Sequence, residues 1–344
     1  MAQPYDRHFD DRPWHPAHPL VPATWLETDT GDGCIASSIH DLAIWTRALM
    51  NRGTGLISGD SFVLLTQKII ERGGSSLPGY YGYGVSTSEH NGNAIISHSG
   101  GMVGYSSFMC ADMDAGLGAC AIVNGLASNA SQQVAWYALE LLQAAAQGRE
   151  LPAVPSPLDR TRVENAVDFA GTYRTTNGAA LTLTSNGERL LLDRGDGQVL
   201  LEADSADTFR TLHPDFDRHL FRFARDELGT VSEVFHGPAW YTGDDYSGPT
   251  SFDYPGEWDV YPGHYRCYNP WHTNVRIVLR KGRLALLHSG GAEEPLMPLP
   301  DGSFRIGDDL ESPERAHFHA DAVVDGQCLR VNLSGNDFER FFTQ

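Results

Sequence analysis

The feature that most constrains the fold is an internal repeat in the C-terminal half of the chain. Phe-Ala-Gly-Thr-Tyr-Arg at residues 169–174 returns as Tyr-Pro-Gly-His-Tyr-Arg at residues 261–266. Corresponding runs follow each copy in the same order: Leu181–Leu183 with Val275–Val278, Arg189–Leu192 with Arg283–Leu286, and Phe209-Arg210 with Phe304-Arg305. Short apolar runs alternate with Asn-Gly, Asp-Gly, Leu-Gly and Lys-Gly turns, which is typical of antiparallel strands. A copy of about 90 residues suits one small barrel of about eight strands.

The sequence predicts three domains separated by recognisable connectors. Three prolines between Leu151 and Pro157 indicate a stiff, extended linker. The two β-barrels are then expected at residues 158–245 and 256–344, with a loop at 241–258 between them. Residues 1–150 form the remaining domain, which has a different texture.

Helical periodicity and strand-like runs are mixed in residues 1–150. Helices are expected at residues 37–53, with Ser38 and Asp41 as a capping box, from Ser58 until Gly73-Gly74 ends the helix, and at 128–147. Four strands are expected at residues 81–85, 94–97, 105–110 and 118–123. The apolar residues expected to face inward are Ile39, Leu42, Trp45 and Leu49 in the first helix and Val134, Tyr137, Ala138, Leu141 and Leu142 in the third. This domain is therefore expected to be α+β, a sheet covered by helices.

Charge and composition exclude several classes of partner. The chain has 25 Lys and Arg against 44 Asp and Glu, a formal charge of −19, which disfavours nucleic acid and anionic membranes. Residues 1–8 do not form a signal peptide and no run is long and apolar enough to span a membrane, so the expected location is cytoplasmic by default. The five cysteines lack any C-x-x-C pair and are expected to be buried free thiols, Cys34 among them.

The most informative motif is His98-Ser99-Gly100, followed by Gly101 and then Gly104-Tyr105-Ser106-Ser107. Together with Tyr81-Gly82-Tyr83-Gly84 upstream and an apolar run ending in Asn124-Gly125, it resembles the third signature of serine β-lactamase-like, penicillin-recognising hydrolases of the class C kind. The histidine version is typical of the D-aminopeptidase-like members. The resemblance covers roughly residues 20 to 147, and some D-aminopeptidases also carry two lipocalin-like barrels after the catalytic domain.

The resemblance implies a fold and a set of residue roles. The fold is the C-terminal part of a β-lactamase/transpeptidase-like antiparallel sheet with helices, followed by two lipocalin-like barrels. His98, Ser99 and Gly100 would line the substrate cleft, and Gly101 would donate its backbone N–H to an oxyanion, which makes His98 and Gly101 the catalytic candidates. No cofactor and no metal is implied.

The family's other two motifs are missing from this sequence. The only lysines are Lys68 and Lys281, and the residues three positions before them are Leu65 and Val278, so S-x-x-K is absent. No Tyr-x-Asn occurs either. Because both motifs normally precede H-x-G by a long stretch and only 97 residues precede His98, the catalytic domain is interpreted as N-terminally truncated. Such a domain is expected to be inactive alone and to expose apolar surface.

Three alternatives remain open at this point. In the first, the paired barrels form a non-catalytic binding or regulatory module that holds a small apolar ligand or docks on a partner. In the second, a separate N-terminal chain that carries the missing motifs complements this one. The acidic, aromatic loop at 241–258 is either a solvated linker or a gate for the cleft. The histidine groups His15 with His18, His213 with His219, and His317 with His319 each lack a third ligand and are interpreted as ordinary histidines.

Overall fold

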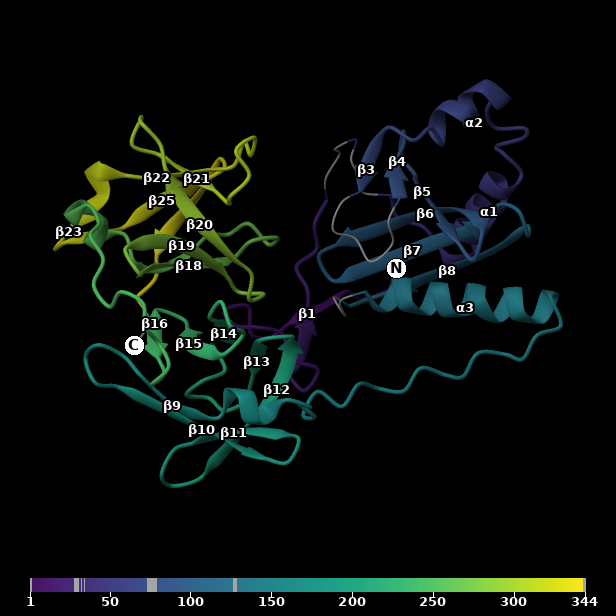
Figure 1. The fold of residues 1–344 in the computed structure, drawn as a ribbon. Helices are drawn as coiled ribbons and strands as arrows, with labels where there is room; N and C mark the ends of the chain where they lie inside the picture. Colours follow the sequence, from purple (N-terminus) through teal and green to yellow (C-terminus); the bar gives the residue numbers. More distant parts are fainter. Residues whose placement is uncertain are drawn as a thin grey trace. The chain divides into compact units, whose positions relative to one another are not determined.

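The chain forms two compact units (Figure 1), and the structure, a computed structural model, describes residues 2–27, 31, 33, 35–72, 79–125 and 129–342. Unit 1 comprises Met1–His8 and Leu20–Ser156, and unit 2 comprises Phe9–Pro19 and Pro157–Gln344. Cys34, Gly73-Gly74 and Ser128, which the sequence analysis named, lie outside the described residues. None of the described helices is long and apolar enough to cross a membrane.

Unit 1 is built on an antiparallel sheet whose six described strands lie in chain order. They are β3 Ile70–Arg72, β4 Gly79–Tyr81, β5 Ser86–His90, β6 Asn93–Met102, β7 Tyr105–Asp112 and β8 Leu117–Val123. The described helices are α1 Ile39–Met50, α2 Gly59–Leu65 and α3 Ala130–Ala146, and a separate hairpin pairs β1 Tyr5–Arg7 with β2 Leu20–Pro22.

The helices cover both faces of this sheet, because successive residues of a strand point to opposite sides. Ile95 and Cys110 pack with Leu139 of α3 in one buried cluster. Their chain neighbours Ile96 and Met109 pack with Leu49 of α1 and Phe62 of α2 in another. Unit 1 is thus a sheet between helices, as the α+β prediction requires.

The first helix begins as its sequence predicts. The Ser38 hydroxyl accepts a hydrogen bond from the Asp41 N–H at 3.2 Å and donates one to the Asp41 carboxylate at 2.8 Å. Ser58 caps α2 in the same way, accepting from the Ser61 N–H. These side chains satisfy backbone donors that the first helical turn leaves without a partner.

Two predicted elements between residues 58 and 90 were wrong in extent. The helix after Ser58 ends at Leu65, and residues 70–72 form strand β3 instead of a final helical turn. Residues 82–85 form a turn closed by the Gly82 N–H and the Val85 carbonyl at 2.9 Å, and the strand begins only at Ser86. Strand β5, Ser-Thr-Ser-Glu-His, was missed because it lacks the apolar alternation that marks a strand.

The predicted inward faces of the helices were also partly wrong. Val134 and Leu142 are 57% and 42% exposed, whereas α3 buries Ser131, Ala135, Leu139, Gln143 and Ala144. These buried positions form a stripe with a spacing of four, and its polar members find partners on the sheet: Ser131 bonds Ser106 and Gln143 bonds Asp112. On α1, Leu49 is buried but Ile39 and Trp45 are half exposed.

Unit 1 exposes many large apolar side chains on and around α1 and α2. They are Ile35, Ile39, Ile44, Trp45, Leu56, Ile57, Val63, Leu64, Ile69, Ile70 and Tyr83. Scattered apolar residues are normal on a protein surface, but so many in one sequence segment are not. This part of unit 1 therefore buries only a fraction of its apolar surface within the described residues.

A buried carboxylate ties the sheet to α3. Asp112, at the end of β7, is fully buried and accepts hydrogen bonds from Asn93 at 2.7 Å and Gln143 at 2.6 Å. The backbone N–H groups of Asp114 and Ala115 also donate to it. Burial alone raises the pKa of this carboxyl, but the four hydrogen bonds to its charged form outweigh burial and lower the pKa.

Unit 2 contains two closed antiparallel barrels of eight strands each (Figure 1), the architecture that the repeat predicts. The first is β9 Gly171–Arg174, β10 Ala180–Asn186, β11 Arg189–Asp193, β12 Gln198–Ser205, β13 Thr208–Arg210, β14 Phe221–Arg225, β15 Val231–His236 and β16 Ala239–Thr242. The second is β17 Gly263–Arg266, β18 Asn274–Arg280, β19 Arg283–His288, β20 Glu293–Pro298, β21 Phe304–Ile306, β22 Arg315–Phe318, β25 Arg330–Leu333 and β26 Asn336–Arg340. A hairpin of β23 Val323–Val324 and β24 Gln327–Cys328 lies outside the second barrel, and short 3-10 helices span Ala166–Phe169, Gly256–Val260 and Ala320–Ala322.

The repeated Tyr-Arg motif has the same structural role in both barrels. Tyr173 and Tyr265 are buried in the two cores, and each hydroxyl donates to a carbonyl four residues earlier, Phe169 at 3.1 Å and Tyr261 at 2.7 Å. Burial raises the pKa of Tyr173 to about 12. The tyrosine thus fixes the entry of the chain into the first strand of each barrel while filling its interior, which explains why the motif recurs.

Residues 9–19 belong with the barrels, although they precede most of unit 1 in the sequence. Arg12 forms an ion pair with Asp217 at 2.6 Å, and His15 contacts Glu202 at 2.8 Å, both on the first barrel. Asp10 pairs with Arg266 of the second barrel at 2.7 Å. Nothing in the sequence signals this arrangement, because its contacts join residues about 200 positions apart.

A β-lactamase-like candidate site

The candidate site lies on β6, a central strand of the unit 1 sheet. Along β7 the register pairs His98 with Met109, Ser99 with Phe108 and Gly101 with Ser106. On its other side β6 pairs with β5 only up to Ser97, which lies opposite Ser86. Residues 98–102 therefore have one neighbouring strand among the described residues and an open edge on the other side.

The open edge presents particular backbone groups. Strands β5 and β6 are joined by the two-residue turn Asn91-Gly92, both with positive φ, so the flanking residues His90 and Asn93 exchange hydrogen bonds. In an antiparallel ladder every second residue then points its N–H and C=O toward the same neighbour. Counting from Asn93, Ser99 and Gly101 direct theirs toward β5, beyond the point where β5 ends.

The glycines keep this edge accessible. A Cβ added at Gly101 would meet no heavy atom of the described residues within 4 Å. A Cβ at Gly100 would instead collide with the Ser107 hydroxyl on the neighbouring strand. Gly101 therefore leaves room for a ligand beside the main chain, whereas Gly100 leaves room for the Ser107 side chain.

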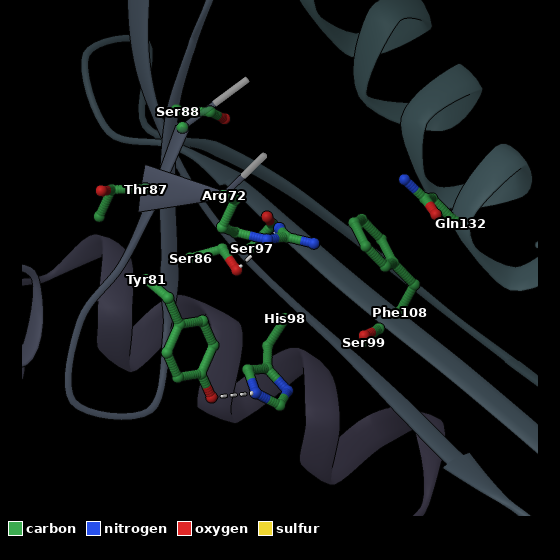
Figure 2. Close-up of a pocket in the computed structure, with 11 residues that line it drawn as sticks. Arg72, Tyr81, Ser86, Thr87, Ser88, Ser97, His98, Ser99, Phe108 and Gln132 are labelled. Atoms are coloured by element: carbon green, nitrogen blue, oxygen red, sulfur yellow. Dashed lines mark hydrogen bonds between the residues drawn. The ribbon is translucent and has the colours of Figure 1, made fainter. Parts of the chain in front are cut away.

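His98 is held by a tyrosine from another strand. The Tyr81 hydroxyl lies 2.9 Å from Nε2 of His98, and the two ring centroids are 5.9 Å apart (Figure 2). Tyr81 ends strand β4, and its Tyr-Gly-Tyr-Gly segment turns there before β5 begins. The contact orients the imidazole and allows a proton to be exchanged between the phenol and the ring.

A polar cavity of about 260 Å³ adjoins this pair (Figure 2). Its walls come from β3 to β7 and from α3: Arg72, Gly79, Tyr81, Ser86, Thr87, Ser88, Ser97, His98, Ser99, Phe108 and Gln132. Arg72 donates to the Ser86 hydroxyl at 3.0 Å. Hydroxyls, an amide and one guanidinium dominate the lining, so the cavity suits a small polar ligand.

The cavity contains only part of the predicted site. His98 and Ser99 line it, whereas Gly100 and Gly101 continue the same strand without lining it. Sequence reasoning assigned no role to Tyr81, Arg72 or Gln132. Tyr81 belongs to the Tyr-Gly-Tyr-Gly motif, but no sequence pattern marks Arg72 or Gln132.

The histidines and cysteines form no metal centre within the described part of the chain. His15 faces Glu202, and His213 lies 2.5 Å from Arg194. Cys110 and Cys328 are buried free thiols, and burial raises the pKa of Cys110 to about 12. A thiol with a raised pKa is a poor nucleophile at neutral pH.

A sheet flanked by helices, with His-Ser-Gly on a strand that borders a cavity, defines unit 1 as a β-lactamase-like domain. Residues 2–144 match the family described as Beta-lactamase, so this part of the chain is similar to members of that family. No curated protein matches the sequence.

Several solved structures are also similar to the chain. One is the octameric penicillin-binding protein homologue from Pyrococcus abyssi, at 19% identity and a TM-score of 0.39, covering 70% of this chain and 52% of that one. Another is SurE, at 19% identity and a TM-score of 0.32, covering 70% and 55%. SurE with D-Leu matches at 22% identity and a TM-score of 0.25, covering 60% and 50%. The chain thus spans about half the length of these proteins.

Proposed function

We propose that unit 1 supplies the substrate-binding wall of a serine hydrolase that acts through an acyl-enzyme. The substrates are amide or ester bonds of D-amino-acid peptides, esters or β-lactam-like molecules. The observation that carries this proposal is the His98-Ser99-Gly100-Gly101 segment, which follows the end of the β5 ladder and whose first two residues border the polar cavity.

Each residue of this segment has a distinct role. Ser99 and His98 hold the polar groups of the substrate, and Gly100 leaves room for the Ser107 hydroxyl on the neighbouring strand. The Gly101 N–H, which points to the open edge, donates to the oxyanion that forms when the acyl carbon is attacked. A preorganised donor of this kind is worth about 3 to 4 kcal/mol in the transition state.

The nucleophile is the part that this sequence does not supply. A serine attacks an acyl carbon only when a neighbouring base removes its proton, and S-x-x-K places a lysine one helical turn from the serine for this purpose. Lys68 follows Leu65 and Lys281 follows Val278 at that spacing. We therefore propose that this chain does not turn over substrate alone, and that a complementing chain carrying the nucleophile completes the site.

The test is hydrolysis by the purified chain. Nitrocefin, D-amino-acid p-nitroanilides and short-chain esters are offered, and a fluorophosphonate probe reports any activated serine by intact mass. The expected result is no turnover above that of the His98→Ala variant and no covalent adduct. Turnover that His98→Ala abolishes, or an adduct on any serine of this chain, would show that the chain contains its own nucleophile.

The alternative function, a binding module in which the barrels enclose a small apolar ligand, is not favoured by the barrel interiors. Phe169, Phe209 and Phe223 pack edge to face in the first barrel, with ring centroids 4.8 to 5.5 Å apart. Phe304 packs against Trp258 and Phe318 in the second. Interiors filled by aromatic rings hold side chains in the place of a ligand.

A further inference from the structure

One of the two lysines of the chain is enclosed by aromatic rings. Lys281 occupies the turn between β18 and β19 of the second barrel, and its side chain reaches the outer face of the first. There, alternation along β15 turns Val234 into the core and Glu233 and Phe235 outward. Trp240 on β16 is the register partner of Phe235.

The ammonium group of Lys281 contacts a carboxylate and three rings. Its Nζ lies 2.7 Å from Oε2 of Glu233. It also lies 5.2 Å from the ring centroid of Trp240, 5.6 Å from that of Tyr246 and 6.0 Å from that of Phe235. All three distances are within the range of a cation–π interaction.

The cage is held together by contacts among its own members. The Trp240 indole N–H donates to the same Glu233 oxygen at 2.6 Å, which fixes both side chains. Tyr246 and Phe252, from the loop between the barrels, meet the Trp240 ring edge to face at 5.5 and 5.7 Å. The carboxylate and the rings are therefore held in place by contacts that do not involve the Lys281 ammonium group.

The residues beside Lys281 fit the same surface. Arg280 donates to the Gly237 carbonyl at 3.0 Å, and its guanidinium lies 5.0 Å from the Phe235 ring centroid. Gly282 has a φ of +69°, and a Cβ there would lie 2.9 Å from the Phe252 Cβ. The turn that contains Lys281 thus packs closely against the surface of the first barrel, with the ammonium group at the end of the turn's lysine side chain.

We propose that Glu233, Phe235, Trp240 and Tyr246 form a binding site for a primary ammonium group on the first barrel. Lys281 of the second barrel occupies this site and so holds the two barrels together. The ligand class follows from the chemistry of the site. Three rings favour a compact cation, and the Glu233 carboxylate requires an N–H donor. An alkylammonium ion fits both requirements, whereas a quaternary ammonium satisfies only the rings.

The first experiment compares the two lysines as internal references. The native chain is acetylated with a water-soluble succinimidyl ester and the rate at each lysine is followed by peptide mass spectrometry. Lys68 is exposed, and its Nζ lies 5.2 Å from the ring centroid of Tyr80. Lys281 is expected to react about tenfold more slowly, and Trp240→Ala should remove most of the difference. Equal rates at both lysines in the native chain would overturn the proposal.

The second experiment asks for chemical rescue. Lys281→Ala keeps a Cβ at this positive-φ position, so backbone strain is unchanged while the ammonium is lost. Millimolar propylammonium is expected to raise the melting temperature of this variant, with saturation, and to leave the native chain unaffected. Tetramethylammonium and propanol should do less. An equal response of native chain and variant, or equal rescue by propanol, would refute an ammonium site.

Discussion

The two units solve the problem of burying a sheet in different ways. Each barrel of unit 2 closes its sheet on itself and fills the interior with its own side chains, so that Phe209, Phe221 and Tyr265 are almost completely buried. Among its described residues, unit 1 leaves the end of β6 without a second neighbouring strand and exposes Trp45 and Val63 on its helices. A closed sheet needs no partner, whereas an open edge is where a ligand or another chain can bind.

The largest expected effect comes from the barrel core. Phe209→Ala removes a ring that is 1% exposed and packs against Phe169 and Phe223, so it should lower the free energy of unfolding of unit 2 by about 3 to 5 kcal/mol. Trp45→Ala, on a half-exposed side chain of α1, should cost less than about 1 kcal/mol. Urea denaturation of the full chain measures both. Similar losses for the two variants would erase the contrast between the units.

Acid should weaken the two units over different pH ranges. Burial lowers the pKa of His264 to about 4 and that of His219 to about 3, so both are neutral in the folded barrels. Between the unfolded pKa near 6.5 and these values the unfolded chain binds more protons, and stability falls as the pH falls. His264 alone accounts for on the order of 3 kcal/mol. Asp112 of unit 1 has a lowered pKa, so its contribution is lost only below about pH 4.

Unfolding measured as a function of pH shows which unit loses stability first as the pH falls. Unit 2 should weaken steadily from pH 6.5 to pH 4 while unit 1 is unaffected. The His264→Gln variant, which keeps a polar side chain but cannot take up a proton, should show a shallower slope. Were unit 1 to weaken first, or the slope to be unchanged in the variant, the account of these buried groups would be wrong.

A smaller effect tests the ordinary helix signals of unit 1. Ser38→Ala removes the side chain that accepts from the Asp41 N–H and should cost about 1 kcal/mol. Its neighbour Ser37 donates to the Ser38 carbonyl and does not cap the helix, so Ser37→Ala is the matched control and should be nearly neutral. Thermal unfolding of unit 1 provides the readout. A larger cost at Ser37 than at Ser38 would argue against the capping box.

The barrels and the caps were predictable because their determinants are local or repeated. The Tyr-Arg motif occurs twice and marks the first strand of each barrel, and Ser38 and Asp41 lie within one helical turn of each other. Strand β5 was missed because it is polar, and the buried stripe of α3 was missed because apolar residues occur on every side of that helix. Packing against the sheet, and not hydrophobicity, selects Ala135 and Gln143 for burial.

The candidate site was predictable only in part for a similar reason. His98 and Ser99 stand in a motif, whereas Arg72 and Gln132 reach the cavity from other elements. The packing of residues 9–19 against the barrels and the cage around Lys281 depend on contacts between distant parts of the sequence. Such contacts follow from the tertiary fold and leave no local pattern.

The central claim, that the open edge of β6 is the acyl-binding wall, is tested most directly by amide NMR. A D-amino-acid amide is titrated into the chain, with its L enantiomer as the control. The account predicts saturable shifts at the Ser99 and Gly101 amides for the D form, weaker ones for the L form, and loss of the response in Gly101→Ala, where the added Cβ meets no heavy atom of the described residues within 4 Å. Shifts confined to the barrels, or none at these two amides, would contradict it.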